Sequence, residues 1–262
     1  MANLMTRKVI FTCCAVLLLS NTQLCAQQII NSGTILFERK VNMHKMMESY
    51  NQNEDQGWIT RYKKENPKYA IVNFDLAFND SISVYRKSKT QPPKDPNERG
   101  GFFFRGNDDE EYVMHKNLNT GKLVASKQVF EMLALVQDSI PKVEWKLTNE
   151  FKQFAGYNCR KATTMMFDTV FVIAYYTDAI ACSSGPQSFA GLPGMVLCVH
   201  VPRTFTTYIA KEVNTTAVLP ADLIPPSKGT KHTYRSLTKA VSEAANEWNK
   251  RWLSRTLWNM LM

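Results

Sequence analysis

Residues 70–78 alternate between apolar and polar side chains, and this period of two constrains the fold more than any other feature of the chain. Apolar residues stand at positions 70, 72, 74, 76 and 78, whereas Asn73 and Asp75 fall on the opposite side. Successive side chains of a β-strand point to opposite faces, so the pattern predicts a strand with one buried face. Asn79 and Asp80 form a turn signal, and the same period continues through 81–86, which predicts a β-hairpin.

Similar runs recur along the chain. We expect strands at 34–41, 102–105, 111–115, 123–126, 143–149, 159–167, 169–177, 195–201 and 204–213. Pro92, Pro93 and Pro96 stand among charged residues, so 87–101 is predicted to be an exposed loop, and a short helix is expected at 58–64. Apolar residues recur every three or four positions in 236–262, a spacing typical of an amphipathic helix.

These patterns together predict a mainly β, single-domain protein. We expect a strongly twisted antiparallel sheet or a partly open barrel, followed by a C-terminal amphipathic helix at 236–262. With 262 residues and 44% apolar composition, the chain is long enough to bury one large core.

The first 26 residues have the organisation of a secretory signal peptide. Arg7 and Lys8 precede an apolar run at 9–19, and Ala26 provides a small residue at the expected cleavage point. The run is shorter than the roughly 20 residues that a membrane-spanning helix needs, although an uncleaved anchor is the alternative. We therefore expect an exported domain at 27–262 with no transmembrane segment, in the periplasm, at the outer membrane or outside the cell.

The charge of the chain does not indicate a nucleic-acid partner. Lys and Arg number 32 against 23 Asp and Glu, a net charge of +9. The basic residues occur singly or in pairs, without the clustered basic and aromatic motifs of a nucleic-acid-binding module. The simplest interpretation of the positive charge is a solvated basic surface.

A tight turn is predicted at Gly191, Leu192, Pro193 and Gly194. Pro193 presets φ for the first central position of a type II turn, and Gly194 tolerates the positive φ of the second. The predicted strand at 195–201 follows this turn directly. From the residues alone, the segment is a structural turn.

The turn and several other blocks resemble the GLPGLI family of exported Bacteroidetes proteins. The similar blocks are 33–45, 116–122, 138–146, 154–162 and 174–177, besides the signature turn itself. The resemblance implies an exported, one-domain protein of antiparallel strands. It implies no reaction, cofactor or catalytic residue.

The cysteines outside the signal peptide are Cys159, Cys182 and Cys198. An exported protein would oxidise a close pair, so they allow one disulfide in any of three pairings, with buried free thiols as the alternative. Cys198 and His200 lie two apart on a predicted strand and therefore share a face, which is the spacing of a candidate nucleophile and base. No third member of such a site is visible.

Two further groups of residues suggest chemistry. Met43, His44, Met46 and Met47 are soft ligands of the kind that bind Cu(I), although Met also fills irregular cores. Ser81, Ser139 and Thr169 each follow an Asp and precede an aliphatic residue, which resembles the O-glycosylation pattern of exported Bacteroidetes proteins.

The sequence thus favours a non-catalytic envelope protein that binds a hydrophobic ligand or an envelope protein partner, without a cofactor. The expected binding surface is an apolar groove lined by inward faces such as that of 70–78. Two alternatives stay open: a metal-handling protein built on the Met/His cluster, and an enzyme of unrecognised type around Cys198 and His200.

Overall fold

The computed structural model describes residues 29–50, 56–93, 112–129, 131–245 and 250–261. The predicted signal peptide and the predicted strand at 102–105 lie outside these residues. The predicted loop at 87–101 lies inside them only as far as residue 93.

Twelve strands of the described residues form one sheet. They are β1 (Gly33–Asn42), β2 (Tyr69–Phe78), β3 (Ile82–Lys87), β4 (Val113–Asn117), β5 (Lys122–Val129), β6 (Met132–Ser139), β7 (Lys146–Phe154), β8 (Tyr157–Met166), β9 (Val170–Thr177), β10 (Met195–Val201), β11 (Thr206–Asn214) and β12 (Thr230–His232). Their order is β12-β6-β5-β4-β3-β2-β1-β11-β10-β9-β8-β7. All neighbours are antiparallel except β12 and β6, which are parallel.

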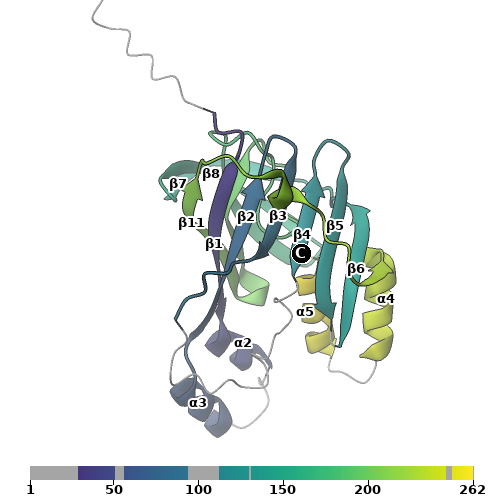
Figure 1. The fold of residues 1–262 in the computed structure, drawn as a ribbon. Helices are drawn as coiled ribbons and strands as arrows, with labels where there is room; N and C mark the ends of the chain where they lie inside the picture. Colours follow the sequence, from purple (N-terminus) through teal and green to yellow (C-terminus); the bar gives the residue numbers. More distant parts are fainter. Residues whose placement is uncertain (1–28, 51–55, 94–111, 130, 246–249, 262) are drawn as a thin grey trace, which may run out of the picture.

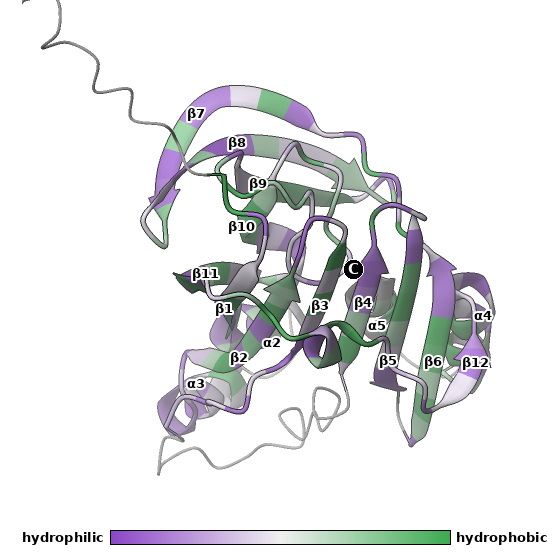
Figure 2. Cartoon of the chain, turned by 45° about the horizontal axis from the view of Figure 1, so that its top comes forward, coloured by the Kyte–Doolittle hydropathy of each residue, from purple (hydrophilic) through white to green (hydrophobic). Residues whose placement is uncertain are grey.

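The sheet is strongly twisted but is not closed into a barrel, because its edge strands β12 and β7 do not pair with each other. Figure 1 shows β1 to β6 side by side, and Figure 2 shows β7 to β10 arching over them. The mainly β prediction and the twisted sheet are therefore confirmed. β6 and β12 were missing from the predicted strands.

The concave face of the sheet carries the main core. Phe74, Leu76 and Phe78 are fully buried there, as the alternation in 70–78 predicts. Tyr85 of β3 stacks on Phe74, with ring centroids 4.8 Å apart. The opposite face, which carries Asp75, is called the outer face below.

Helices cover the ends of the sheet. α2 (Met43–Tyr50) and α3 (Gln56–Glu65) follow β1, so the helix predicted at 58–64 is present and α2 was not foreseen. The single C-terminal helix predicted at 236–262 is wrong, because the structure has α4 (Tyr234–Ala244) and α5 (Lys250–Leu261) instead. The reason lies in packing, since Leu237 and Val241 of α4 are buried beside β6, whereas α5 contacts β5 and the turn after β10.

Residues 182–194, between β9 and β10, form a loop that lies almost entirely inside the molecule. From Ser184 to Ala190 every residue is buried, although none is in a strand or helix. A buried loop leaves backbone carbonyls without water, and these groups need another partner.

Lys116 of β4 supplies that partner. Its Nζ donates to the carbonyl oxygens of Gly185 at 2.7 Å, Gln187 at 2.7 Å and Phe189 at 3.1 Å. The side chain is fully buried, and this burial lowers the pKa of Lys116 to about 7. One ammonium group thus fastens the buried loop to the sheet.

A second buried lysine holds α5. Lys127 of β5 donates to the carbonyl oxygen of Met260, in the last turn of α5, where a positive charge is favourable to the helix dipole. The rings of Tyr112 and Tyr234 lie 5.4 and 5.7 Å from its Nζ. Burial lowers the pKa of Lys127 to about 7 as well.

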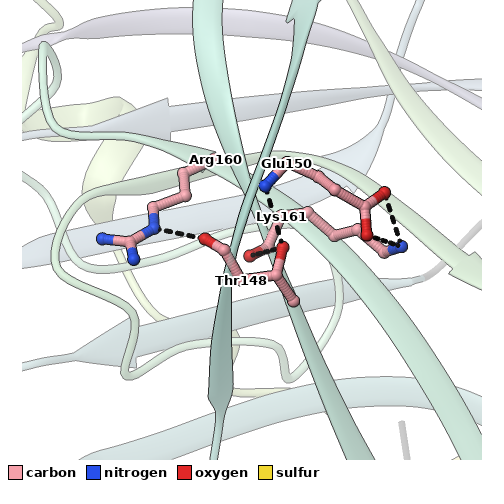
Figure 3. A network of polar contacts seen from close by, with 4 residues as sticks. All are labelled: Thr148, Glu150, Arg160 and Lys161. Carbon is pink, nitrogen blue, oxygen red and sulfur yellow. Dashed lines mark hydrogen bonds and ion pairs between the residues drawn. The ribbon is translucent and has the colours of Figure 1, made fainter.

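The edge strand β7 is distorted rather than open to further pairing. Its register against β8 shifts between Leu147 and Phe151. Figure 3 shows the polar contacts at this bulge: the Arg160 Nε donates to the Thr148 carbonyl at 2.6 Å, and Lys161 pairs with Glu150 at 2.9 Å. A bulge and charged side chains on an edge strand discourage edge-to-edge aggregation.

Candidate functional site: a polar groove on the outer face

The outer face carries a groove of about 560 Å³ across β11, β1, β2 and β3. Its lining is Thr34, Ile35, Leu36, Asp75, Ala77, Arg86, Lys87, Ser88, Lys89, Thr90, Glu212, Asn214 and Asp222. The volume lies within the usual range of small-molecule and short-peptide sites.

Strand register places the charged residues of the groove in one row. Leu36 of β1 lies opposite Glu212 of β11 on one side and Asp75 of β2 on the other. Asp75 in turn lies opposite Arg86 of β3. Because partners in a sheet point to the same face, Glu212, Leu36, Asp75 and Arg86 all face the groove.

One wall of the groove is a strap, residues 215–229, which runs from β11 to β12 across the outer face (Figure 1). Its short helix η4 (Pro220–Leu223) contacts β2 and β3. The Arg86 Nη2 donates to the Asp222 Oδ1 at 2.9 Å and so latches the strap to β3. Leu219 and Ile224, which flank η4 in the chain, are 67% and 64% exposed.

The other wall is the loop that follows β3. Asn73 and Gln91 exchange hydrogen bonds: Gln91 Nε2 donates to the Asn73 carbonyl at 2.9 Å, and the Asn73 N–H donates to Gln91 Oε1 at 3.1 Å. Ser88 is buried and its N–H donates to the Asn73 carbonyl at 2.9 Å. The prediction of an exposed loop from residue 87 is therefore wrong at its start, because Lys87 ends β3 and Ser88 packs against β2.

The charges in the groove are only partly satisfied. Arg86 and Asp222 pair with each other, whereas the carboxylates of Asp75 and Glu212 make no hydrogen bond or ion pair with the part of the chain that the structure describes. Across the whole lining, three carboxylates balance three cations. The groove can therefore hold a polar ligand through charge and hydrogen bonds.

The signature turn closes the buried loop. Gly194 has a φ of 137°, so the predicted positive φ is present. The Gly194 N–H donates to the Leu192 carbonyl at 2.8 Å, which closes a three-residue turn centred on Pro193 instead of the four-residue type II turn. A side chain at position 194 would lie 2.1 Å from the Thr177 carbonyl oxygen, so the backbone passes β9 too closely for anything but glycine.

The three cysteines are buried and free. Cys159 lies on β8 and Cys198 on β10, with β9 between them. Two strand spacings amount to about 10 Å, beyond the reach of a disulfide. Burial raises the pKa of each thiol, Cys182 included, to about 12.

Cys198 and His200 share the outer face, but their environment does not favour nucleophilic chemistry. A thiol with a pKa of about 12 stays protonated at neutral pH. The Nδ1 of His200 is 2.8 Å from the Thr207 hydroxyl rather than bonded to Cys198. Burial also lowers the pKa of His200.

The Met/His cluster lies at the start of α2. Met43 and Met47 are buried with Tyr62 in a small second core, and Met46 packs against it. The Nε2 of His44 donates to the Asn66 carbonyl at 3.0 Å. This arrangement matches the packing role of Met in irregular cores.

The three predicted O-glycosylation residues lie where chains reverse or end. Ser81 is in the turn between β2 and β3, Ser139 is the last residue of β6, and Thr169 is in the turn between β8 and β9. Ser139 and Thr169 are exposed, and Ser81 is half-buried.

The predicted apolar groove was placed on the inward face of 70–78. That face is filled by the chain's own core, because Phe74, Leu76 and Phe78 are fully buried. No helix among the described residues is long and apolar enough to cross a membrane.

Sequence reasoning missed Lys116, Lys127 and the groove. A signal for the lysines existed, because residues two apart on a strand share a face. Lys116 shares a face with Met114, and Lys127 shares a face with Leu123 and Ala125, all of which are buried. The outward position of Asp75 was predicted. No sequence signal could place Glu212 or Asp222 beside it.

Residues 164–198 match a family model described as a protein of unknown function (Porph_ging). This stretch contains β9, the buried loop and the signature turn. No curated protein sequence matches the chain.

One solved structure supports the fold, and two others show a weaker likeness. A structure of PNGF-II in space group P21 superimposes with a TM-score of 0.51 at 14% identity, over 80% of this chain and 33% of that one. PNGF-II in space group C2 gives 0.49 at 14% identity, over 87% and 33%. An uncharacterized conserved protein from Thermus thermophilus gives 0.38 at 7% identity, over 79% and 93%. The chain thus spans about a third of the length of PNGF-II, and the likeness concerns the fold alone.

Proposed function

We propose that the chain is an exported, non-catalytic binding protein of the cell envelope, whose ligand or partner occupies the groove between the strap and the loop after β3. The groove carries this proposal, because it is the feature of the outer face that combines a ligand-sized volume with unpaired polar groups. Both of its walls are fastened to the sheet, one through Arg86 and Asp222 and the other through Asn73 and Gln91. A preformed site of this kind loses little conformational entropy on binding.

Export and family are part of the same proposal. The pattern of 1–26 supports export, and the blocks that resemble the GLPGLI family support an origin in the Bacteroidetes envelope. The matched stretch 164–198 supports relationship to a family whose function is unknown. A non-catalytic role is supported by the buried, protonated thiol of Cys198, which is the strongest nucleophile candidate in the sequence.

The test is native mass spectrometry of the mature chain purified from the envelope fraction of its host. Three proteins are compared: wild type, Thr34→Trp and Thr163→Trp. Both threonines are half-buried strand residues, but Thr34 lines the groove whereas Thr163 lies on β8, outside it. Each variant's melting temperature is measured first, to establish that it folds.

We expect an additional bound mass on the wild type and on Thr163→Trp that is absent from Thr34→Trp. A bare chain in all three preparations, or a bound mass that Thr34→Trp retains, would contradict the proposal.

A further inference from the structure

The groove separates its unpaired charges in space. Asp75 and Glu212 flank Leu36 near the β11 side, about two strand spacings or roughly 10 Å apart between Cα atoms. Lys89 lies beyond the end of β3, is exposed and forms no ion pair with the described residues. Arg86 of β3, directly opposite Asp75, and Asp222 neutralise each other.

This layout favours a ligand that is itself neutral but has two charged ends. A simple cation would meet three carboxylates but also three cations in the lining, and a simple anion would meet the same balance. A zwitterionic ligand can place its cationic group between Asp75 and Glu212 and its anionic group near Lys89. Each contact is then between opposite charges. Asp75 is half-buried, so its contact is strengthened by partial desolvation, whereas Glu212 and Lys89 are exposed and add weaker, salt-sensitive contacts.

The dimensions and the floor of the groove suit a short peptide. Four strands from β11 to β3 span about 14 Å, which is the length of an extended segment of four to five residues. Leu36 and Ala77 supply an apolar floor for the side chains between the charged ends.

Resting on the binding role proposed above, we infer that the groove binds an extended peptide segment with a basic side chain at one end and a carboxylate at the other. The ammonium or guanidinium group lies between Asp75 and Glu212, and the carboxylate lies near Lys89. The segment belongs either to a free peptide or to an exposed stretch of a protein partner, since both present the same groups.

The probe is a C-amidated pentapeptide, Lys-Ala-Ala-Ala-Glu, with an uncharged fluorophore at its N-terminus, so that its only charges are the Lys ammonium and the Glu carboxylate; it is titrated by fluorescence anisotropy with the mature chain. A matched peptide with norleucine in place of Lys removes the cation and keeps the apolar stem. The protein variants are the double variant Asp75→Asn/Glu212→Gln, the groove-blocking Thr34→Trp, and Glu243→Gln, which alters an exposed carboxylate on α4, outside the groove.

We expect the double variant and the norleucine peptide each to weaken binding by about tenfold or more, because each removes the charge-assisted contacts. Glu243→Gln should bind like the wild type, and raising NaCl from 50 to 500 mM should weaken wild-type binding. The same probe sequence carried in a loop of a larger protein tests whether the source can be a protein segment.

Three results would overturn the inference. The first is no binding of the pentapeptide to the wild type, and the second is equal affinity of the double variant and the wild type. The third is displacement of the probe by free spermidine as effectively as by unlabelled peptide, which would indicate a polyamine site. Native mass spectrometry of the wild type and Thr34→Trp reports on any ligand in the groove. If it detects a bound mass that Thr34→Trp lacks, but the pentapeptide does not bind, the proposed function stands and this inference fails.

Discussion

At the scale of single residues, Lys116 holds the buried loop against the sheet through three hydrogen bonds. A buried loop with seven consecutive buried residues and no regular hydrogen-bond ladder is costly unless its carbonyl groups find donors. The three N–H bonds of one ammonium group match the three carbonyl oxygens of Gly185, Gln187 and Phe189. Next to it, the hydroxyls of Ser83 and Ser184 lie 2.7 Å apart and tie β3 to the same loop.

Replacing Lys116 with Met should therefore be severe even though the new side chain is apolar. The substitution leaves three buried carbonyl oxygens without a donor, so we expect the free energy of unfolding to fall by at least about 3 kcal/mol. Urea unfolding followed by fluorescence measures the loss. Lys122→Met, at an exposed position of β5, is the control and should change stability by less than about 0.5 kcal/mol. Equal stabilities of the two variants would mean that the loop does not depend on Lys116.

At the scale of elements, the signature turn and the buried loop act together. The loop enters the core after β9 and must leave it at the start of β10, and Gly194 is the point where its backbone passes the Thr177 carbonyl. This close approach explains why glycine stands directly before β10, a strand in which every residue except His200 is buried. The matched family stretch, 164–198, spans this same unit.

Two glycines of the turn should respond differently to substitution. Both have positive φ, 88° at Gly191 and 137° at Gly194, but a Cβ at Gly191 meets only the Trp145 Nε1 at 4.0 Å. Gly191→Ala should cost about 1 kcal/mol, from backbone strain alone. Gly194→Ala should cost more than about 3 kcal/mol, because the new methyl group clashes with backbone atoms that cannot move away. Thermal melts of the two variants provide the comparison, and similar melting temperatures would contradict it.

Other elements show where local patterns were sufficient and where they were not. The alternation in 70–78 correctly predicted both faces of β2, including the outward Asp75, because a strand's faces follow from the sequence of that strand alone. The continuous helix predicted at 236–262 failed because α4 and α5 pack on different surfaces. The polar composition of 43–65 as a whole concealed α2, whose buried side is made of Met43 and Met47.

At the scale of the whole molecule, the buried titratable groups make stability depend on pH. Unfolded lysines keep their proton up to about pH 10.5, whereas burial lowers the pKa of Lys116 and Lys127 to about 7 in the folded state. Above pH 7 the unfolded chain therefore binds more protons than the folded chain, and stability rises with pH. Above about pH 9 the buried thiols lower stability as the pH rises. Their pKa values are raised to about 12 in the folded state, so the folded chain then binds more protons than the unfolded chain.

We therefore expect the melting temperature to rise from pH 7 to about pH 9 and to fall again at higher pH. The rise corresponds to at most about 1.4 kcal/mol per pH unit for each lysine. Scanning calorimetry in buffers of matched ionic strength measures the profile, and Lys127→Met should reduce the slope below pH 9. A melting temperature that is constant or falls between pH 7 and pH 9 would contradict the assignment.

The sequence alone determined most of the strands, the mainly β class and the inward and outward faces of β2, because alternation is a local property that each strand carries by itself. It also placed a positive φ at Gly194, since proline and glycine act on their own backbone. Only the tertiary structure decided that β11 pairs with β1, that the strap returns across β3, and that Lys116 meets the loop some seventy residues further along the chain. The candidate site depends on these long-range pairings, since Asp75, Glu212 and Asp222 come from segments that no local pattern connects.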